Sequence, residues 1–254
     1  MAAARTLSAQ RLIEATGVYG LTRPALLAGV FALGAYLQAR GVIPAILRHS
    51  GDVLYLVRQH LFLAAVSGAL AIGVGVPLGI LLTRPRFRAY ANAMTQLVNL
   101  GTTIPTLAIL AIAMSVLGIG APPAIFGLFL LTLLPIVLNT IAGLRSVPAH
   151  LIEAARGMGM TPGQILLGVE VPNALFVILA GIRTALAINV GTVPLAFLIG
   201  GGGLGELIFT GIDLMEPGML LAGAIPTALL AILVDFALGQ CQYWLIPRGV
   251  NPLR

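Results

Sequence analysis

Long unbroken apolar runs are the feature that most constrains the fold of this chain. Hydrophobic residues make up 59% of it and charged residues only 9%, more apolar surface than a soluble core needs. A chain that crosses a bilayer does so as helices or as a closed barrel. Barrel strands alternate polar and apolar residues, which these runs do not. The sequence therefore predicts an all-α fold, a polytopic membrane helix bundle.

Six membrane segments are expected, most of them near the roughly twenty residues that cross a hydrocarbon core. The five stronger ones lie at about Leu61–Leu82, Leu97–Leu117, Pro122–Ile141, Asn173–Ile199 and Met219–Leu238. The other, at about Leu21–Gln38, is short between its flanking proline and glutamine, so it is either a span or an interfacial helix.

One membrane domain, residues 51–245, is expected, preceded by an extension at 1–50 and followed by a tail at 246–254. Residues 1–20 hold Arg5, Arg11 and Glu14 and no apolar core, so we do not expect a cleaved signal peptide.

Arginine placement predicts the orientation in the membrane. With the 142–172 loop inside, the cytoplasmic side holds Arg5, Arg11, Arg23, Arg84, Arg86, Arg88, Arg145, Arg156, Arg248 and Arg254. Only Arg40, Arg48 and Arg58 then lie outside. The loop at 200–217 is acidic and has no arginine, as an outer loop should. Six spans would leave both termini cytoplasmic.

The basic residues also exclude several functions. All 14 are arginine; without lysine the chain cannot form a P-loop, so any ATP would bind another subunit. The arginines flank membrane segments instead of gathering on a soluble face, which argues against nucleic-acid binding.

A membrane enzyme would need clustered catalytic groups, which we do not find. The scattered histidines and the single Cys241 predict no metal site.

The polar segment at 145–172 is too long for a simple turn between spans. Val147-Pro148 ends the preceding helix. His150–Met158 favours a short helix that Gly157 and Gly159 can end. Thr161-Pro162 is typical of an N-cap and the first position of a second helix running toward Pro172. Two short helices joined at an angle are expected, with a plain amphipathic surface loop as the alternative.

This segment resembles a known signature. Glu153-Ala154-Ala155 is followed after three residues by Gly159, and after nine more by Val169-Glu170-Val171-Pro172. The spacing is similar to the cytoplasmic EAA coupling motif of ABC importer permeases, with valines where isoleucine and leucine are commoner.

Three further stretches are similar to the glycine betaine, carnitine and choline permeases among those importers. They are Gly101–Ala108, Ala180–Thr192 with its Arg183, and Ile199–Gly205. The likeness covers about residues 50–245. A methionine or other amino-acid permease is the alternative substrate class; a secondary carrier, which would lack the coupling segment, is less favoured.

The resemblance implies a type I ABC importer-like transmembrane domain in the cell inner membrane. Two permease subunits, identical or related, would form the pore with two ATPase subunits inside and a substrate-binding protein outside. ATP and Mg would sit on the ATPase, and this chain would carry no cofactor or catalytic residue. The residues expected to dock on the ATPase are Glu153, Ala154, Ala155, Arg156, Gly157, Gly159 and Pro172.

Two ionisable residues lie inside predicted spans, where a charge is costly unless it is paired or wet. Arg183 and Asp235 have compatible depths, which predicts a buried pair within one subunit or across the dimer. The alternative is that each meets water separately. Further polar residues would either line a translocation path or bond neighbouring helices; they are Asn99, Thr102, Thr103, Asn139, Asn189 and Thr192.

Overall fold

Every regular element of the described chain is a helix, which confirms the all-α prediction. The computed structural model describes residues 27–32, 34–36, 38–39, 41–87, 90, 93, 96, 101 and 103–250. The chain divides into two compact units, Met1–His49 and Ser50–Arg254.

The N-terminal unit contains a short apolar helix, Leu27–Tyr36, and then α2, Val42–Arg48. The predicted segment Leu21–Gln38 begins outside the described residues, so whether it spans the membrane stays a prediction.

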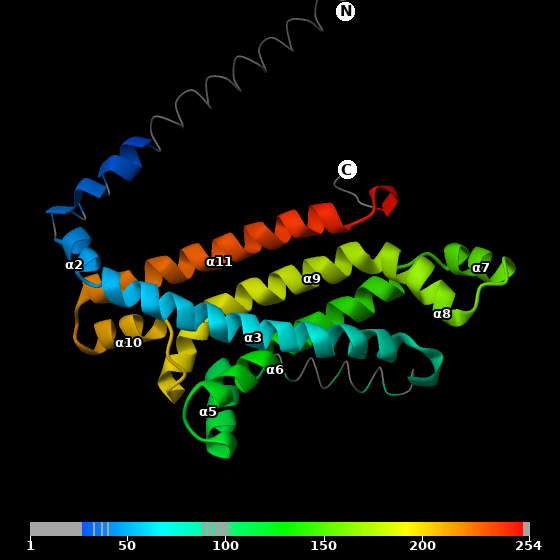
Figure 1. Cartoon of the computed structure of the whole chain (residues 1–254), viewed down its shortest axis with the longest axis horizontal. Coiled ribbons are helices and arrows are strands. Elements are labelled where there is room, and N and C mark those ends of the chain that lie inside the picture. The colour runs from blue at the N-terminus through cyan, green and yellow to red at the C-terminus, as the bar shows by residue number, and fades with distance from the viewer. Residues whose placement is uncertain are drawn as a thin grey trace, which may run out of the picture. The chain divides into compact units, whose positions relative to one another are not determined.

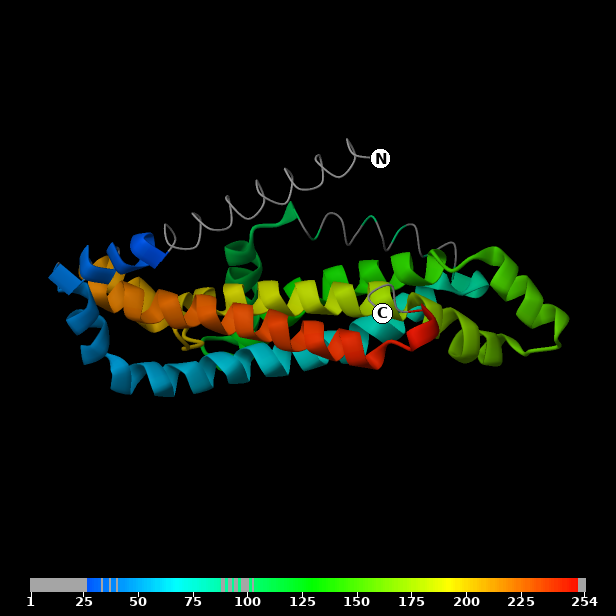
Figure 2. The same cartoon turned by 90° about the horizontal axis from the view of Figure 1, so that it is seen from above.

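Four helical runs in the second unit are long and apolar enough to cross a membrane. Three are α3 (Ser50–Thr83), α6 (Ala121–Arg145) and α11 (Pro217–Leu245). The other, Pro162–Ile199, joins α8 (Pro162–Ile165), the π-helical η2 (Leu166–Glu170), α9 (Val171–Thr192) and the 3-10 segment η3 (Val193–Ile199). Figures 1 and 2 show α3, α6, α9 and α11 lying lengthwise beside one another. They correspond to the second, fourth, fifth and sixth predicted segments.

The third predicted segment, Leu97–Leu117, is interrupted at a proline. The described helix α5 starts only at Thr106 and ends at Leu117. Pro105 has φ −57° and ψ 135°, an extended conformation, and Ile104 lies outside any helix. A proline disfavours helical geometry in the residue before it, which explains the break. At 12 residues, α5 is too short for a full crossing; residues 97–100 and 102 lie outside the described part.

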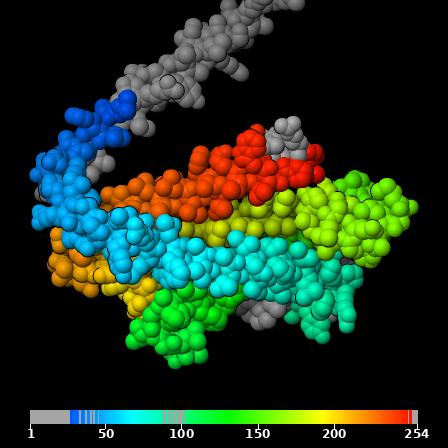
Figure 3. Space-filling view, in the orientation of Figure 1, coloured from blue at the N-terminus to red at the C-terminus, as the bar shows by residue number. Residues whose placement is uncertain are grey.

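Small residues bring the central helices together. On α3, a Cβ at Gly75 would stand 2.9 Å from Ile136 of α6, and one at Gly79 would stand 2.6 Å from Thr140. Gly181 of α9 faces Asn139 of α6 with no room for a side chain. Figure 3 shows α9 between α3 and α11 on one face of this unit. Close backbone approach of this kind is how helices associate in lipid.

The glycine run after the fifth segment forms an ordered turn. Gly200, Gly202 and Gly203 have φ of 78°, 78° and 87°, conformations that favour glycine. Gly203 N–H donates to Gln59 Oε1 of α3 over 3.1 Å. The chain then forms α10 (Gly205–Asp213), at the opposite end of this unit from α7 (Ala149–Gly157) and α8 (Figure 1).

Candidate functional site

The polar segment begins with helix α7 and ends in a Schellman turn. Gly159 N–H donates to Arg156 O at 2.9 Å, and Met160 N–H donates to Ala155 O at 3.1 Å. This pattern requires a left-handed residue after the helix, and Gly159 supplies it with φ 78°. The glycine predicted to end the helix therefore occupies the position where glycine is needed.

The second short helix starts with a full capping box. Thr161 Oγ1 accepts from Gln164 N–H at 3.4 Å, and Gln164 Oε1 accepts from Thr161 N–H at 2.8 Å. Pro162 follows at the first helical position. The N-cap predicted from Thr161-Pro162 is confirmed.

The second helix does not stop at Pro172 but runs on into the membrane span. Val171 N–H donates to Leu166 O, which makes the π turn that links α8 to α9. Asn173 Nδ2 donates to Val169 O at 2.7 Å, so a side chain satisfies one carbonyl in the turn before the proline ring. The sequence predicted a separate short helix here; instead one continuous rod joins the polar segment to α9.

The seven predicted docking residues differ in exposure. Ala155 is 1% exposed and packs inward. Pro172 is intermediate, at the start of α9. The exposed members all lie on α7 and its closing turn: Glu153, Ala154, Arg156, Gly157 and Gly159. Met158, on the same surface, is 75% exposed. We call this exposed surface, residues 153, 154 and 156–159, the α7 face.

An ion pair that the sequence analysis missed holds this segment to α3. Arg84 Nη2 lies 2.5 Å from Glu170 Oε2, with the two side chains 26% and 13% exposed. Thr83 Oγ1 also accepts from Arg84 Nη2 at 2.8 Å. Glu170 lies in the π turn, so the pair joins the end of α3 to the start of the α9 rod.

Arg183 and Asp235 lie together, in the pair that the sequence proposed. Arg183 Nε donates to Asp235 Oδ1 and Arg183 Nη2 to Asp235 Oδ2, both at 2.6 Å. This two-bond geometry is the favoured one between guanidinium and carboxylate. Gly239 leaves room for it, since a Cβ there would stand 3.0 Å from Arg183 Nη1. The side chains are 37% and 41% exposed in the single chain, so burial of the pair across a dimer stays a prediction.

The predicted path residues do not form one group. Asn189 and Thr192 line a hollow of about 290 Å³ between α9, α6 and α5 that Thr106 and Thr132 also line. Asn139 is not among its lining residues; its Nδ2 donates to Pro135 O in its own helix, at 2.8 Å. Thr103 is exposed. Asn99 and Thr102 lie outside the described residues.

Asn189 also holds two helices together. Its Nδ2 donates to Ser67 Oγ at 2.9 Å and to Ala64 O at 3.2 Å, both on α3. One turn before Ala64 in α3, the fully buried His60 places its Nε2 2.9 Å from Val190 O of α9. These buried polar contacts set the register of α3 on α9, a role the sequence left open for Asn189 and did not find for His60.

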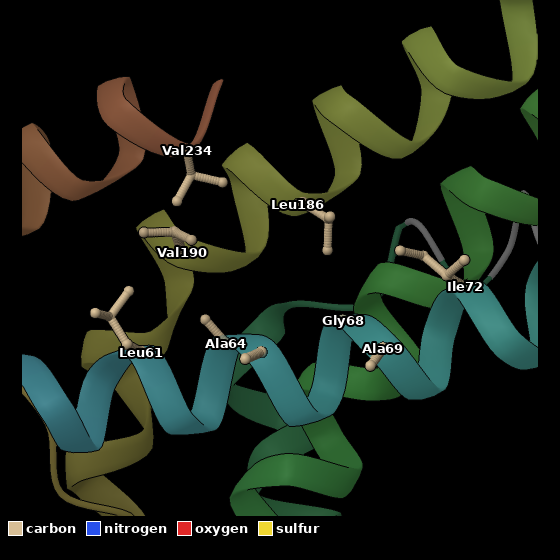
Figure 4. A pocket seen from close by; sticks show the side chains of 9 residues that line it. Leu61, Ala64, Gly68, Ala69, Ile72, Leu186, Val190 and Val234 are labelled. Carbon is tan, nitrogen blue, oxygen red and sulfur yellow. The ribbon is translucent and has the colours of Figure 1, made fainter. Parts of the chain in front are cut away.

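An apolar groove of about 310 Å³ lies between α3, α9 and α11. Figure 4 shows Ala64 and Gly68 of α3 facing Leu186 and Val190 of α9, with Val234 of α11 beyond. Every residue that lines the groove is apolar, so it suits hydrocarbon rather than a charged solute.

Comparison with known proteins identifies the family. The protein-family model described as "Binding-protein-dependent transport system inner membrane component" matches residues 75–248 of this chain. The chain is 56% identical over 199 residues to the osmoprotectant import permease protein OsmY of Salmonella typhimurium, covering 78% of this chain and 84% of that protein. It is 47% identical over 204 residues to the carnitine transport permease protein OpuCB of Listeria monocytogenes, covering 80% and 92%.

Among solved structures, the inward-facing MetNI methionine ABC transporter is similar with a TM-score of 0.69 and 26% identity, over 78% of this chain and 96% of that chain. Fold and site together define a multi-pass inner-membrane transport subunit with the architecture of a type I ABC importer. The chain belongs to the family of binding-protein-dependent transport system inner membrane components.

Proposed function

We propose that this chain is the permease subunit of an ATP-driven importer that moves an osmoprotectant such as glycine betaine, carnitine or choline into the cell. The observation that carries the proposal is the α7 face, an exposed helix whose closing turn leads through a capped helix into a membrane span. The names of the two relatives, osmoprotectant and carnitine permeases, support the substrate class.

The α7 face would dock on an ATPase subunit at the cytoplasmic side. Arg84 and Arg156 at this end favour that orientation by the positive-inside rule, which counts basic residues. Both termini would then be cytoplasmic if the first apolar segment spans.

Movement of α7 would reach the membrane along two routes. The first is the rod from α8 through the π turn into α9. The second is the Arg84–Glu170 pair, which holds α3 to the same turn. Closure of two ATPases on ATP and Mg would therefore tilt α3 and α9 together and switch the path between outward and inward access. A second permease subunit would complete the pore, and a substrate-binding protein would deliver solute from outside.

The test is transport by the reconstituted complex. The permease, its ATPase and its binding protein are placed in proteoliposomes, and ATP-dependent uptake of labelled glycine betaine, carnitine, choline and methionine is measured. We expect uptake of at least one quaternary ammonium solute and none of methionine. Uptake of methionine alone would favour the amino-acid alternative, and uptake independent of the ATPase would contradict the proposal.

A further inference from the structure

A hollow with both charged and apolar lining residues lies against α9 and α11, apart from the α7 face. Its volume is about 500 Å³, within the range of small-molecule sites, about 300–1,000 Å³. Arg183 of α9 lines it together with six residues of α11: Ile232, Asp235, Phe236, Gly239, Gln240 and Tyr243. It contains an ion pair, two aromatic rings and an amide.

The ion pair of the hollow lies in the middle of the span, and the lining extends along α11 to Tyr243, two residues before that helix ends. Gln242 Nε2 donates to Phe176 O at 3.1 Å, which fixes the antiparallel register of α11 on α9. Seven residues further along each helix come Arg183 and Asp235, consistent with that register. Arg183 is also thirteen residues past Glu170, roughly 20 Å at 1.5 Å per residue. That places the ion pair deep within a hydrocarbon core of about 30 Å.

An ion pair with this much exposed surface is unfavourable against acyl chains. More than a third of each side chain is exposed in the single chain, 37% for Arg183 and 41% for Asp235. Ionised groups at mid-depth are tolerated where they meet water or other polar groups. This side of α9 and α11 is therefore turned to a polar space rather than to acyl chains.

The chemistry of the hollow suits one class of solute. A quaternary ammonium group has no N–H to donate, so aromatic faces and a carboxylate recognise it. Phe236 and Tyr243 are seven residues apart and so share one face of α11, and Phe236 is 62% exposed. Asp235 stands beside them as the anion. Arg183 offers a planar donor group to a carboxylate.

We propose that this hollow is a substrate site of the permease itself, for a zwitterion that carries a quaternary ammonium and a carboxylate; this rests on the function proposed above. On binding, the solute's carboxylate pairs with Arg183, and its ammonium group pairs with Asp235 and contacts the rings of Phe236 and Tyr243. One ion pair is exchanged for two, and the net charge of the site does not change. A cation without a carboxylate, such as choline, uses Asp235 and the rings alone.

The test measures equilibrium binding of labelled glycine betaine to the permease–ATPase complex in nanodiscs, without the binding protein. Wild type binds saturably. Phe236→Leu weakens binding about tenfold, the value of one aromatic contact with a desolvated cation. Phe126→Leu, the same change at an exposed phenylalanine of α6, leaves it unaltered. Absence of saturable binding to wild type, or equal effects of the two leucine variants, overturns the proposal.

A double variant separates binding from structure. Arg183→Gln with Asp235→Asn removes both charges together, so no unpaired charge is left inside the membrane. The complex assembles, and binding of glycine betaine is lost. In Arg183→Gln alone, labelled choline still binds, whereas binding of labelled glycine betaine weakens at least tenfold, the effect of losing a hydrogen bond to a charged group. Full binding in the double variant would show that the pair is structural only and overturn the proposal.

Uptake by wild type distinguishes the two proposals. If the full system imports glycine betaine but the complex without binding protein shows no such site, only the site is wrong. If the full system imports no quaternary ammonium solute, the proposed function fails first.

Discussion

The Arg84–Glu170 pair gives the sharpest test of how the polar segment is connected to the membrane helices. Its geometry is short and direct, 2.5 Å between Nη2 and Oε2, and Thr83 holds the same guanidinium. We consider Glu170→Gln, which removes the charge and keeps the shape, and Arg84→Gln on the other side. The matched control is Arg86→Gln, an exposed arginine two residues away.

The expected size follows from the burial of the pair. A hydrogen bond to a charged group contributes about 1.5–3 kcal/mol when it is well sheltered. Because Arg84 is 26% exposed and Glu170 13%, solvent screening reduces the value to about 1–2 kcal/mol. If the pair forms in only one of the two transport conformations, its loss shifts their equilibrium by about 5- to 30-fold.

The assay is the ratio of solute imported to ATP hydrolysed by reconstituted complexes. Both glutamine variants at the pair should lower the ratio, and the double variant should be no worse than either single one, because the two residues act together. Arg86→Gln should keep the wild-type ratio. Additive losses in the double variant, or wild-type ratios in the single variants, would refute a role for the pair in coupling.

Two further substitutions test particular contacts. Gly159→Val should abolish uptake while leaving membrane insertion intact, because a left-handed β-branched residue costs about 1–2 kcal/mol and reshapes the α7 face; Gly163→Val, at an open position with ordinary φ, serves as control, and wild-type uptake by the Gly159 variant would contradict the assignment. Gly181→Val should overlap Asn139 and cost about 1–3 kcal/mol or more, seen as loss of the complex at lower temperature in detergent, whereas Gly73→Val, at an exposed position on α3, should not.

Much of the architecture could be predicted because its signals are local. Apolar runs of sufficient length identify α3, α6, α9 and α11, and the Gly159 turn and the Thr161 cap depend on residues a few positions apart. The break at Pro105 was not predicted. The apolar run continues through this proline, so the sequence favoured one segment at Leu97–Leu117 although a proline disfavours helical geometry in the residue before it.

The tertiary contacts could not be predicted in the same way. Arg84 and Glu170 are 86 positions apart, and neither differs in sequence from a solvated charge at a helix end. The pairing of Arg183 with Asp235 could be predicted only because ionisable residues inside a span are rare and a charge there is costly without a partner. The sequence did not indicate a role for Phe236 and Tyr243, because they join the proposed site only through the packing of α9 against α11, which places Arg183 beside them.

Contact between the α7 face and an ATPase is the most direct test of the whole account. In a Cys241→Ser background, Met158→Cys places a thiol on the α7 face, and Met215→Cys places one at the opposite end of the bundle; the native side chains are 75% and 88% exposed. A photoactivated cross-linker on each thiol is applied to the assembled complex. We expect position 158 to link to the ATPase and position 215 not to; ATPase linkage at 215, or none at 158, would contradict docking of the ATPase on the α7 face.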